Sequence, residues 1–410
     1  MLLGTAQAII TPPVGTPLAG FGFRDHGSES VLDDLELRVF WMQHDTDATR
    51  AACIVCADII GFDAALTTQL KERLIKDHPL SSASILLCAS HTHSGPQTCS
   101  NMIGVGALIP AVVTNLRDAV LAAVKSARIK LHPVELKLVH GRLDGYSINR
   151  RVVTEGHATS GPNPDGIRDD EVSTIVFSDT ATGDIRALLY HFTCHPTTLG
   201  SYAISSEYPG AARRIIEKSL GFRAVDGSPQ PIAGFLPGCF GDVRPNCTYI
   251  GGKQFRRGQP EDVAAFGSAL GEVVIRSLSS INVADQRQTT ASLRGRETIV
   301  NLPHAQAPSL NSPLTLQRLD LTDEITLLAM GGEVCCGYGR TIKQLPCTGA
   351  TRKVVPLGYT NGITGYIPTA EMFSEGGYEV DDSVVYFSLP APFSPAIDAI
   401  IKSAIHGLMA

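Results

Sequence analysis

Short apolar runs and amphipathic stretches alternate along this chain. Apolar or alternating runs of strand length predict strands over residues 35–44, 51–60, 83–88, 134–139, 172–177, 185–192 and 232–236. Apolar residues at helical spacing predict helices over residues 62–78, 110–128, 209–220 and 261–278. Further strand-like runs cover residues 291–302, 314–321 and 325–330. A last helix is expected to be capped by Ser394, with Pro395 in its first turn.

This order of elements indicates an α/β protein in which helices flank a mixed sheet. No repeat, low-complexity tract or linker interrupts the pattern, so we interpret residues 1–410 as a single domain. Residues 146–170, 238–246 and 357–379 are rich in turn-forming residues and are expected to be loops without regular structure. Loops of such length in a compact domain often carry function.

Composition excludes several classes of protein. With 43% hydrophobic and 18% charged residues, the chain has the balance of an ordinary globular protein. The formal net charge is -6 and no basic cluster is present, so we expect no nucleic-acid partner. Ten cysteines among 410 residues are too few for a disulfide scaffold. Cys53 and Cys56 lie inside a predicted strand, where thiols pack as small hydrophobic groups.

The N-terminal segment does not resemble a secretory signal, because its first charged side chain is Arg24 and Pro12 interrupts its apolar residues. No stretch approaches the roughly 18 apolar residues of a membrane span. We therefore expect a cytoplasmic protein without stable membrane association. The sequence leaves open whether the chain forms a homo-oligomer.

Residue types that bind metals follow three of the predicted strands. His91 and His93 come after one apolar run, and as alternate residues of an extended chain they are expected to point into the same space. His195 and Glu333 each follow another apolar run. Taken singly, each of these residues also fits a turn or a buried hydrogen bond. Together they predict a catalytic metal site, since two histidines and one carboxylate are a common zinc set.

Five short motifs occur in order along the chain. They are Ala-Ser-His-Thr-His-Ser-Gly-Pro at 89–96, His-Phe-Thr-Cys-His-Pro-Thr at 191–197, Gly-Cys-Phe-Gly-Asp-Val-Arg-Pro-Asn at 238–246, Gly-Glu at 332–333 and Asn-Gly-Ile-Thr-Gly-Tyr-Ile-Pro-Thr at 361–369. Their order resembles that of the neutral/alkaline non-lysosomal ceramidase family, and the likeness runs from Thr11 to Glu379. The resemblance implies the fold of a ceramidase-like catalytic domain.

The resemblance also implies one zinc ion. The ligands that it assigns to the ion are His91, His195, Glu333 and Tyr366. It places His93 at the reaction centre and points Tyr378 toward the scissile carbonyl group. It places Arg150 and Gly20 on the substrate side of the pocket.

Position 244 departs from the family pattern. Members of the family have a serine after Gly-Asp-Val, which is their proposed nucleophile, whereas this chain has Arg244. A guanidinium group cannot attack a carbonyl carbon, so either water is the nucleophile or the activity is lost. An arginine in the pocket favours a carboxylate, a phosphate or a similar anion as part of the substrate. Asp242 either orients a ligand histidine or pairs with Arg244.

The family members are also secreted or membrane-associated, and they carry a C-terminal immunoglobulin-like domain that we do not expect here. A sphingolipid within a membrane is therefore not the expected substrate. The sequence predicts a zinc-dependent hydrolase of an amide, lactam or ester bond, with C–N bonds favoured, in a small, anionic, polar molecule. Zinc lowers the pKa of bound water from about 15.7 to near 7, which supplies the nucleophile at neutral pH. His93 would move the proton, and Tyr378 would help to stabilise the oxyanion.

Two alternatives stay open at this point. One is a non-catalytic, zinc-containing relative that binds a ligand, and the other is an N-acyl-sphingosine amidohydrolase with an altered nucleophile. A barrel amidohydrolase also uses closely spaced histidines, but the predicted strand order and the remaining histidines supply no clear further ligand set.

Overall fold

Nineteen strands build the framework of the computed structural model, which describes residues 1–221, 231–281, 290–307, 309–345 and 352–410. The larger sheet contains β1 (Leu2–Ile9), β3 (Glu36–Gln43), β4 (Ala51–Ala57), β5 (Ile85–Ala89), β6 (His132–Arg142), β9 (Glu171–Asp179), β10 (Ile185–Phe192) and β12 (Ile232–Pro237). Its strand order is β12-β10-β9-β6-β1-β3-β4-β5. All seven strands predicted over the first part of the chain are in this sheet, and β1 is an addition.

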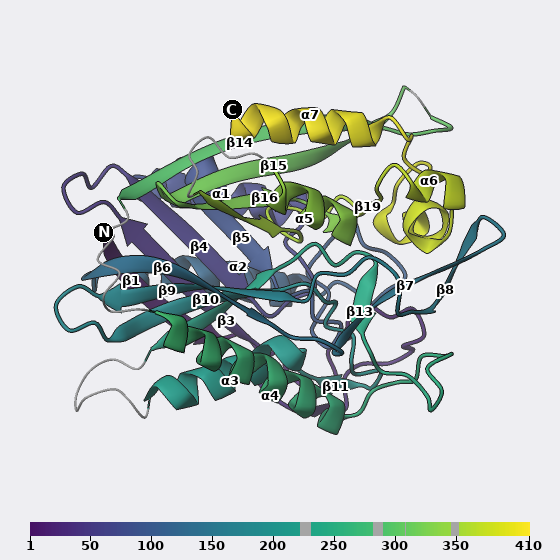
Figure 1. The fold of residues 1–410 in the computed structure, drawn as a ribbon, viewed down its shortest axis with the longest axis horizontal. Coiled ribbons are helices and arrows are strands. Elements are labelled where there is room, and N and C mark those ends of the chain that lie inside the picture. The colour runs from purple at the N-terminus through teal and green to yellow at the C-terminus, as the bar shows by residue number, and fades with distance from the viewer. Residues whose placement is uncertain (222–230, 282–289, 308, 346–351) are drawn as a thin grey trace.

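A smaller sheet stacks on the larger one (Figure 1). It contains, in this order, β14 (Ala291–Pro303), β15 (Asn311–Thr322), β16 (Ile325–Met330) and β18 (Lys353–Leu357). Two short pairs are separate from these sheets, β2 (Ser30–Val31) with β11 (Ala203–Ile204) and β17 (Glu333–Val334) with β19 (Tyr366–Ile367). Parallel and antiparallel pairs both occur, so the predicted mixed sheet and the α/β class are confirmed.

Helices cover the outer faces of both sheets. The α-helices of the described residues are α1 (Ala64–Asp77), α2 (Pro110–Ala127), α3 (Glu207–Gly221), α4 (Pro260–Ser277), α5 (Cys336–Lys343), α6 (Met372–Glu375) and α7 (Ile397–Met409), of which all but α6 cover a sheet. The first four pack on the larger sheet, and α5 and α7 pack on the smaller one. The predicted cap of the last helix is wrong, because α7 begins at Ile397 and its N-cap, Ala396, makes no side-chain capping bond. Ser394 lies before it and accepts the N–H of Ala396.

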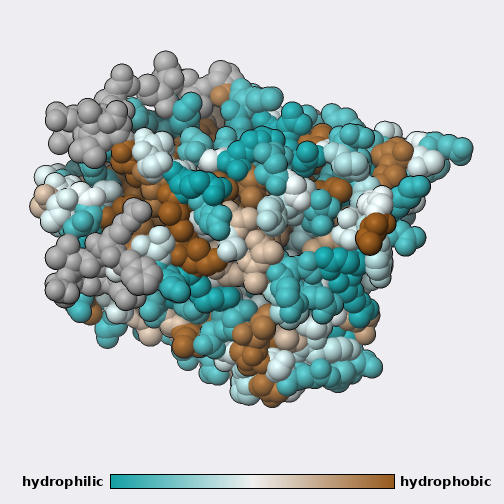
Figure 2. All heavy atoms as spheres, turned by 60° about the horizontal axis from the view of Figure 1, so that its bottom comes forward, coloured by the Kyte–Doolittle hydropathy of each residue, from teal (hydrophilic) through white to brown (hydrophobic). Residues whose placement is uncertain are grey.

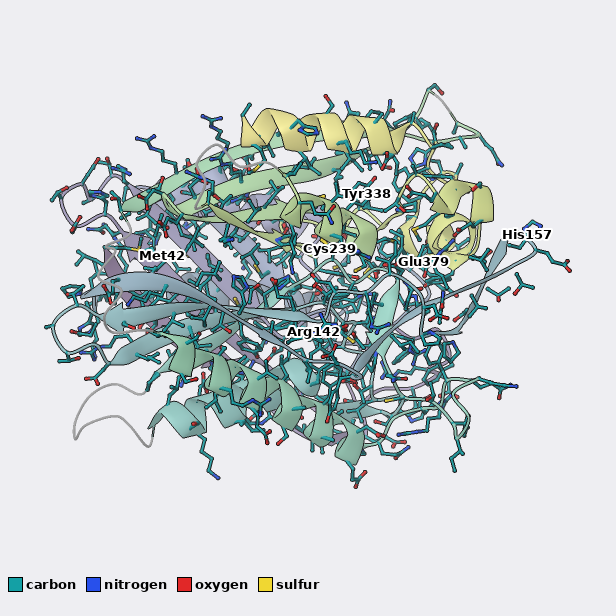
Figure 3. The ribbon with its side chains drawn as sticks, viewed as in Figure 1. Met42, Arg142, His157, Cys239, Tyr338 and Glu379 are labelled. Atoms are coloured by element: carbon teal, nitrogen blue, oxygen red, sulfur yellow. The ribbon has the colours of Figure 1, made fainter. Side chains whose placement is uncertain are left out.

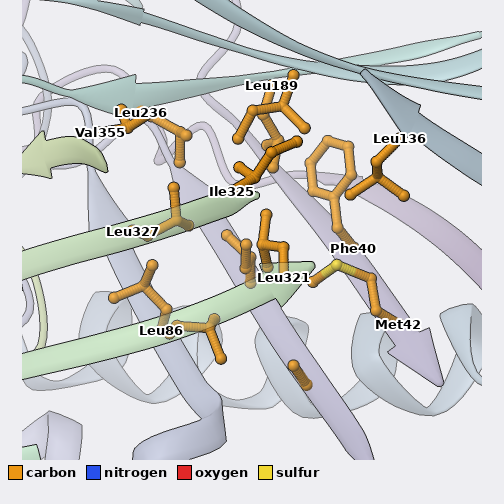
Figure 4. Packing of buried hydrophobic residues seen from close by; sticks show 14 of the residues in the cluster. Phe40, Met42, Leu86, Leu136, Leu189, Leu236, Leu321, Ile325, Leu327 and Val355 are labelled. Atoms are coloured by element: carbon orange, nitrogen blue, oxygen red, sulfur yellow. The ribbon is translucent and has the colours of Figure 1, made fainter. Parts of the chain in front are cut away.

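The main core lies between the two sheets. Figure 4 shows this layer, in which Phe40 and Met42 of β3 face Leu321 of β15 and Ile325 of β16. Alternate residues of β3, including Trp41, point the other way and pack against α1 and α2. Both faces of the larger sheet are therefore buried, which explains why its strands are continuously apolar in the sequence.

Three expected loops contain regular structure instead. Residues 146–170 form a hairpin of β7 (Ser147–Thr154) and β8 (His157–Asn163), whose far tip is marked by His157 in Figure 3. A short strand, β13 (Val243–Pro245), pairs with β7, and β19 and α6 lie within residues 357–379. These elements were missed because their polar residues give no apolar periodicity.

The larger sheet coils so that its two edge strands, β5 and β12, contact each other. The ends of β5 and β10 therefore meet near the end of β16. On the face drawn in Figure 2, hydrophobic residues form separate patches among hydrophilic ones. Among the described residues, no helix combines the length and the apolar character needed to cross a bilayer.

Candidate functional site

His91 lies two residues beyond the end of β5 and is fully buried. Its φ is +65°, so the chain turns here and the expected extended alternation of His91 and His93 is wrong. The two rings nevertheless converge, with 3.3 Å between their Nε2 atoms. Nδ1 of His91 lies 2.6 Å from the carbonyl oxygen of Ile60 and donates to it. This bond leaves a lone pair on Nε2.

His195 repeats this arrangement beyond the end of β10. Its Nδ1 atom donates to the carbonyl oxygen of Phe240 at 2.6 Å. Burial lowers the pKa of His195 to about 4, so its ring is neutral at pH 7. In both rings a backbone carbonyl therefore fixes the tautomer that leaves Nε2 able to bind a metal ion.

Glu333 lies between the two rings at the start of β17. Its Oε2 atom is 3.0 Å from Nε2 of His195 and 3.5 Å from Nε2 of His91. Burial alone would raise the pKa of Glu333, but the two rings outweigh burial and hold this pKa well below its usual value. Glu333 is therefore a carboxylate that faces the Nε2 atoms of both rings.

A cation fits this cluster. A carboxylate oxygen and a ring nitrogen at such distances are held together by a cation between them, either a proton or a metal ion. The ligand atoms of His91, His93 and His195 all lie within 4.8 Å of one another, so this buried histidine group can hold a metal ion.

Gly20 makes room for the ring of His93. Its φ is +92°, and a β-carbon at this position would lie 2.3 Å from Nδ1 of His93. The ring of Phe21 meets His93 with 4.8 Å between centroids. Nδ1 of His93 is buried and has no hydrogen-bond partner among the described residues. Burial, followed by the neighbouring histidines, lowers the pKa of His93 well below its usual value, so the ring is neutral at pH 7.

A cavity of about 480 Å³ lies beside His93. The residues expected on its substrate side or near the reacting carbonyl all line it, namely Gly20, Arg150, Arg244 and Tyr378. Tyr366, which is expected as a metal ligand, lines it as well. The structure thus brings together predicted residues from distant segments of the chain, and Asp242 is the exception described below.

Two consecutive arginines of β7 share one carboxylate. Nε of Arg150 donates to Glu379 at 2.8 Å, and Nη1 of Arg151 donates to it at 2.6 Å. Figure 3 shows Glu379 near the base of the β7–β8 hairpin. The guanidinium carbon of Arg150 is 5.3 Å from the ring centroids of both Tyr366 and Tyr378. Nη2 of Arg150 is buried without a hydrogen-bond partner among the described residues.

Arg244, which replaces the expected serine, reaches the same cavity from β13. Its guanidinium carbon lies 4.1 Å from the ring centroid of Phe255. Its Nε atom is buried, and within the described part of the chain it has no hydrogen-bond partner. Burial, and then the charge of Arg150, lower the pKa of Arg244 to about 10. The cavity therefore has two arginines that each retain an unpartnered N–H group.

Asp242 contradicts both expectations drawn from the sequence. Its Oδ1 atom accepts the backbone N–H of Cys336 at 2.7 Å, and its Oδ2 atom accepts the side-chain N–H of Asn149 at 2.9 Å. Its carbonyl oxygen accepts the N–H of Arg150 at 2.9 Å. Within the described ranges it bonds neither to a histidine ring nor to Arg244. The carboxylate therefore connects α5 to β7, because it accepts one hydrogen bond from a residue of each.

Sequence reasoning missed Tyr359, whose hydroxyl group lies inside the donor cluster. Its oxygen is 3.4 Å from Oε2 of Glu333 and 3.5 Å from Nε2 of His195. Its ring stacks on Phe240 with centroids 4.1 Å apart. Tyr359 comes two residues after the apolar strand β18. The strand-end pattern that indicated the histidines applies here as well, and it would have found this residue.

A further buried carboxylate supports the segment after His195. Glu207 begins α3 with a φ of +59° and is fully buried. Its Oε1 atom accepts the N–H of Leu199 at 2.7 Å, whereas Oε2 has no hydrogen-bond partner among the described residues. Burial raises the pKa of Glu207 to about 7.

Comparison with known proteins agrees with the order of the motifs. Residues 1–263 match the family model described as neutral/alkaline non-lysosomal ceramidase, N-terminal. The neutral ceramidase of Mycobacterium tuberculosis (strain ATCC 25618 / H37Rv) is 25% identical over 243 residues. The match covers 56% of this chain but only 38% of that protein.

Solved structures show the same fold. The neutral ceramidase of Pseudomonas aeruginosa superposes with a TM-score of 0.80 at 18% identity, over 98% of this chain and 73% of the other. A ceramidase complexed with C2 gives a TM-score of 0.79 at 17% identity, over 98% of this chain and 74% of the other.

Proposed function

Since the chain belongs to the neutral/alkaline non-lysosomal ceramidase family, we propose that it is a zinc-dependent hydrolase of a small, anionic amide or lactam. Esters are a secondary substrate class. The observation that carries this proposal is the meeting, beside one cavity, of a buried donor cluster and two arginines with unpartnered N–H groups. The first supplies a place for a cation, and the second a place for an anion.

The residues that would hold the metal ion are His91, His195 and Glu333, together with the tyrosine that the resemblance names, Tyr366. In both rings Nδ1 donates to a backbone carbonyl group, so Nε2 is the atom presented to the ion, and the ring of His195 is neutral at pH 7. When bound, zinc activates water and polarises a carbonyl group, which replaces the missing serine nucleophile.

His93 moves the proton in this proposal. It lines the cavity, it is neutral, and its Nδ1 atom has no partner among the described residues. The ring can take a proton from the attacking water and return it to the leaving nitrogen. Burial raises the pKa of Tyr378 to about 12, so its hydroxyl group keeps its proton and can donate to the carbonyl oxygen as negative charge develops.

Arg150 and Arg244 bind the anionic group of the substrate. A carboxylate or phosphate group accepts several N–H bonds from a guanidinium group and also compensates its charge. Such a group between the two arginines would relieve the repulsion that helps to lower the pKa of Arg244. A long aliphatic chain offers no partner to either arginine.

The test is hydrolysis of matched substrate pairs by the zinc-loaded protein. Each pair consists of an N-acyl amino acid and its neutral carboxamide, with lactams, lactones and N-acyl sphingosine as further arms. We expect kcat/KM to be at least ~10-fold higher for the anionic member, equivalent to about 1.4 kcal/mol. We expect Arg244→Met to remove this preference while kcat/KM for the neutral member stays within about twofold.

Equal kcat/KM values within each pair, or selective cleavage of N-acyl sphingosine, would contradict the anionic substrate class. A metal-loaded protein that binds the anionic compounds but cleaves none of them would support the non-catalytic alternative.

A further inference from the structure

Thr197 lines the cavity, and its hydroxyl group has no use within the fold. The residue is 8% exposed, and Oγ1 is buried without a hydrogen-bond partner among the described residues. Buried hydroxyl groups are normally hydrogen-bonded, because leaving one unpaired costs free energy. Three other residues around the cavity keep a buried polar atom without a partner, namely His93, Arg150 and Arg244. The proposed function uses these three residues and leaves Thr197 unexplained.

Backbone hydrogen bonds place Thr197 between the segment of His93 and the strand β13. The residue before it, Pro196, accepts the N–H of His93 at 3.2 Å. The N–H of His195 donates to Val243 of β13 at 3.1 Å. The N–H of Thr197 itself donates to the carbonyl oxygen of His195 at 3.0 Å, which closes a tight turn. Thr197 therefore lies on the wall of the cavity that joins His93 to β13.

Arg244 belongs to the same wall and is free to bind an anion. Among the described residues no carboxylate pairs with it, and its Nε atom has no hydrogen-bond partner. Phe255 covers one face of the guanidinium group, with 4.1 Å between the guanidinium carbon and the ring centroid. Stacking on one face leaves the N–H groups in the guanidinium plane able to donate. Arg150 differs, because Glu379 already accepts its Nε–H at 2.8 Å.

The loop that carries Phe255 is fixed on both of its neighbours. The N–H of Gly258 donates to the carbonyl oxygen of Thr198 at 3.0 Å, which connects the loop to the segment after β10. Arg256 forms an ion pair with Asp262 at 2.6 Å, which connects it to α4. These contacts hold the aromatic ring on which the guanidinium group rests.

We propose that Thr197 and Arg244 form an oxyanion subsite, in which the Thr197 hydroxyl group contributes to the preference for anionic substrates. This inference rests on the proposed function, because it locates the acidic group of that substrate. One oxygen atom of a carboxylate or phosphate group accepts an N–H of Arg244, and another accepts the O–H of Thr197. A neutral carboxamide has one acceptor oxygen and no charge to compensate the guanidinium group.

The test is the binding of 3-benzoylpropionate, a keto acid without a hydrolysable bond, and of its neutral amide, 3-benzoylpropionamide. Equilibrium dialysis with the zinc-loaded protein measures both dissociation constants, and chromatography checks that the amide stays intact. We expect wild type to bind the acid at least ~10-fold more tightly than the amide. Thr197→Val should weaken binding of the acid by about 10-fold and change binding of the amide by less than about twofold. Thr197→Ser keeps the hydroxyl group and should bind the acid as wild type does.

Thr174→Val is the matched control. Thr174 of β9 is also buried with an unpartnered hydroxyl group among the described residues, but it does not line the cavity. This variant should bind both compounds as wild type does. Because Oγ1 of Thr197 likewise has no partner there, we expect Thr197→Val to melt at the same temperature as wild type or higher. Thr197→Ala answers the same question if Thr197→Val does not fold.

The outcomes separate this inference from the proposed function. Equal binding of the acid and the amide by wild type contradicts the anionic substrate class itself. If wild type prefers the acid but Thr197→Val and Thr197→Ala keep the full preference, Thr197 is not part of the subsite and the proposed function stands. Equal losses in Thr197→Ser and Thr197→Val also overturn the role of the hydroxyl group. An undiminished preference in Arg244→Met overturns the role of Arg244.

Discussion

The two sides of the cavity are built in opposite ways. The donor side, made of His91, His195 and Glu333, presents two Nε2 atoms and a carboxylate. The arginine side, made of Arg150 and Arg244, presents cations that retain unpartnered N–H groups. The donor side can therefore accommodate a metal cation. On the arginine side Glu379 pairs with Arg150, but no carboxylate of the described residues pairs with Arg244, so this side can accommodate a substrate anion. This contrast is the physical basis of the proposed hydrolysis.

The largest effect is expected from removing a donor. Glu333→Ala leaves the two histidine rings without the carboxylate that compensates a cation, so we expect zinc affinity to fall by more than ~100-fold and hydrolysis to be lost. Metal analysis after gel filtration measures the first and substrate turnover the second. His157→Ala, at the exposed tip of the hairpin, is the control and should retain both. Full zinc content in Glu333→Ala would show that Glu333 is not a metal ligand.

The next largest effect tests the arginine side. Glu379→Gln leaves Arg150 and Arg151 buried without their shared charge, so we expect the free energy of unfolding to fall by about 3–5 kcal/mol. Urea denaturation measures it. Glu135→Gln, whose pair with Lys137 is partly exposed at 3.9 Å, should change it by less than about 0.5 kcal/mol. Similar free energies of unfolding for the two variants would show that Glu379 does not stabilise Arg150 and Arg151.

Glu207 belongs to neither side of the cavity. Its raised pKa leads us to expect a free energy of unfolding that depends on pH. Its pKa rises from 4.5 in the unfolded chain to about 7 in the fold, so between these values the folded protein binds more protons than the unfolded one. The free energy of unfolding should therefore decrease between pH 4.5 and pH 7, by about 3 kcal/mol in total. Glu207→Gln should flatten this part of the profile in urea titrations. An unchanged slope in the variant would mean that another group causes it.

The smallest of these effects is expected at the junction of the two sides. A methyl group in Gly20→Ala would displace the ring of His93, so we expect kcat to fall by about 100-fold while zinc content stays unchanged. Gly15→Ala is the matched control, because Gly15 also has a positive φ, +95°, but a β-carbon there meets nothing within 4 Å. Equal activity of the two variants would exclude His93 from proton transfer.

The donor side was easier to predict from the sequence than the arginine side. His91, His195 and Glu333 each follow an apolar strand of the buried core, and such strands are visible as hydrophobic runs. Tyr359 also follows a strand, β18, so the same pattern marks its position. The single-domain interpretation of residues 1–410 stays a prediction.

The arginine side could not be placed in this way. Residues 146–170 form a polar hairpin whose strands face the cavity and solvent, so no apolar alternation marks them. The contacts of Asp242 depend on the pairing of β7 with β13, which joins segments about 90 residues apart. Local pattern does not determine such pairings, because they are set by tertiary packing.

The most direct test of the central claim is metal analysis of the purified wild-type protein combined with turnover of the best substrate before and after chelation. We predict about one zinc ion per chain, loss of turnover when a chelator removes it, and recovery when one equivalent of Zn²⁺ is returned. Full turnover by metal-free protein would contradict the claim that this cavity combines a bound cation with an anionic substrate.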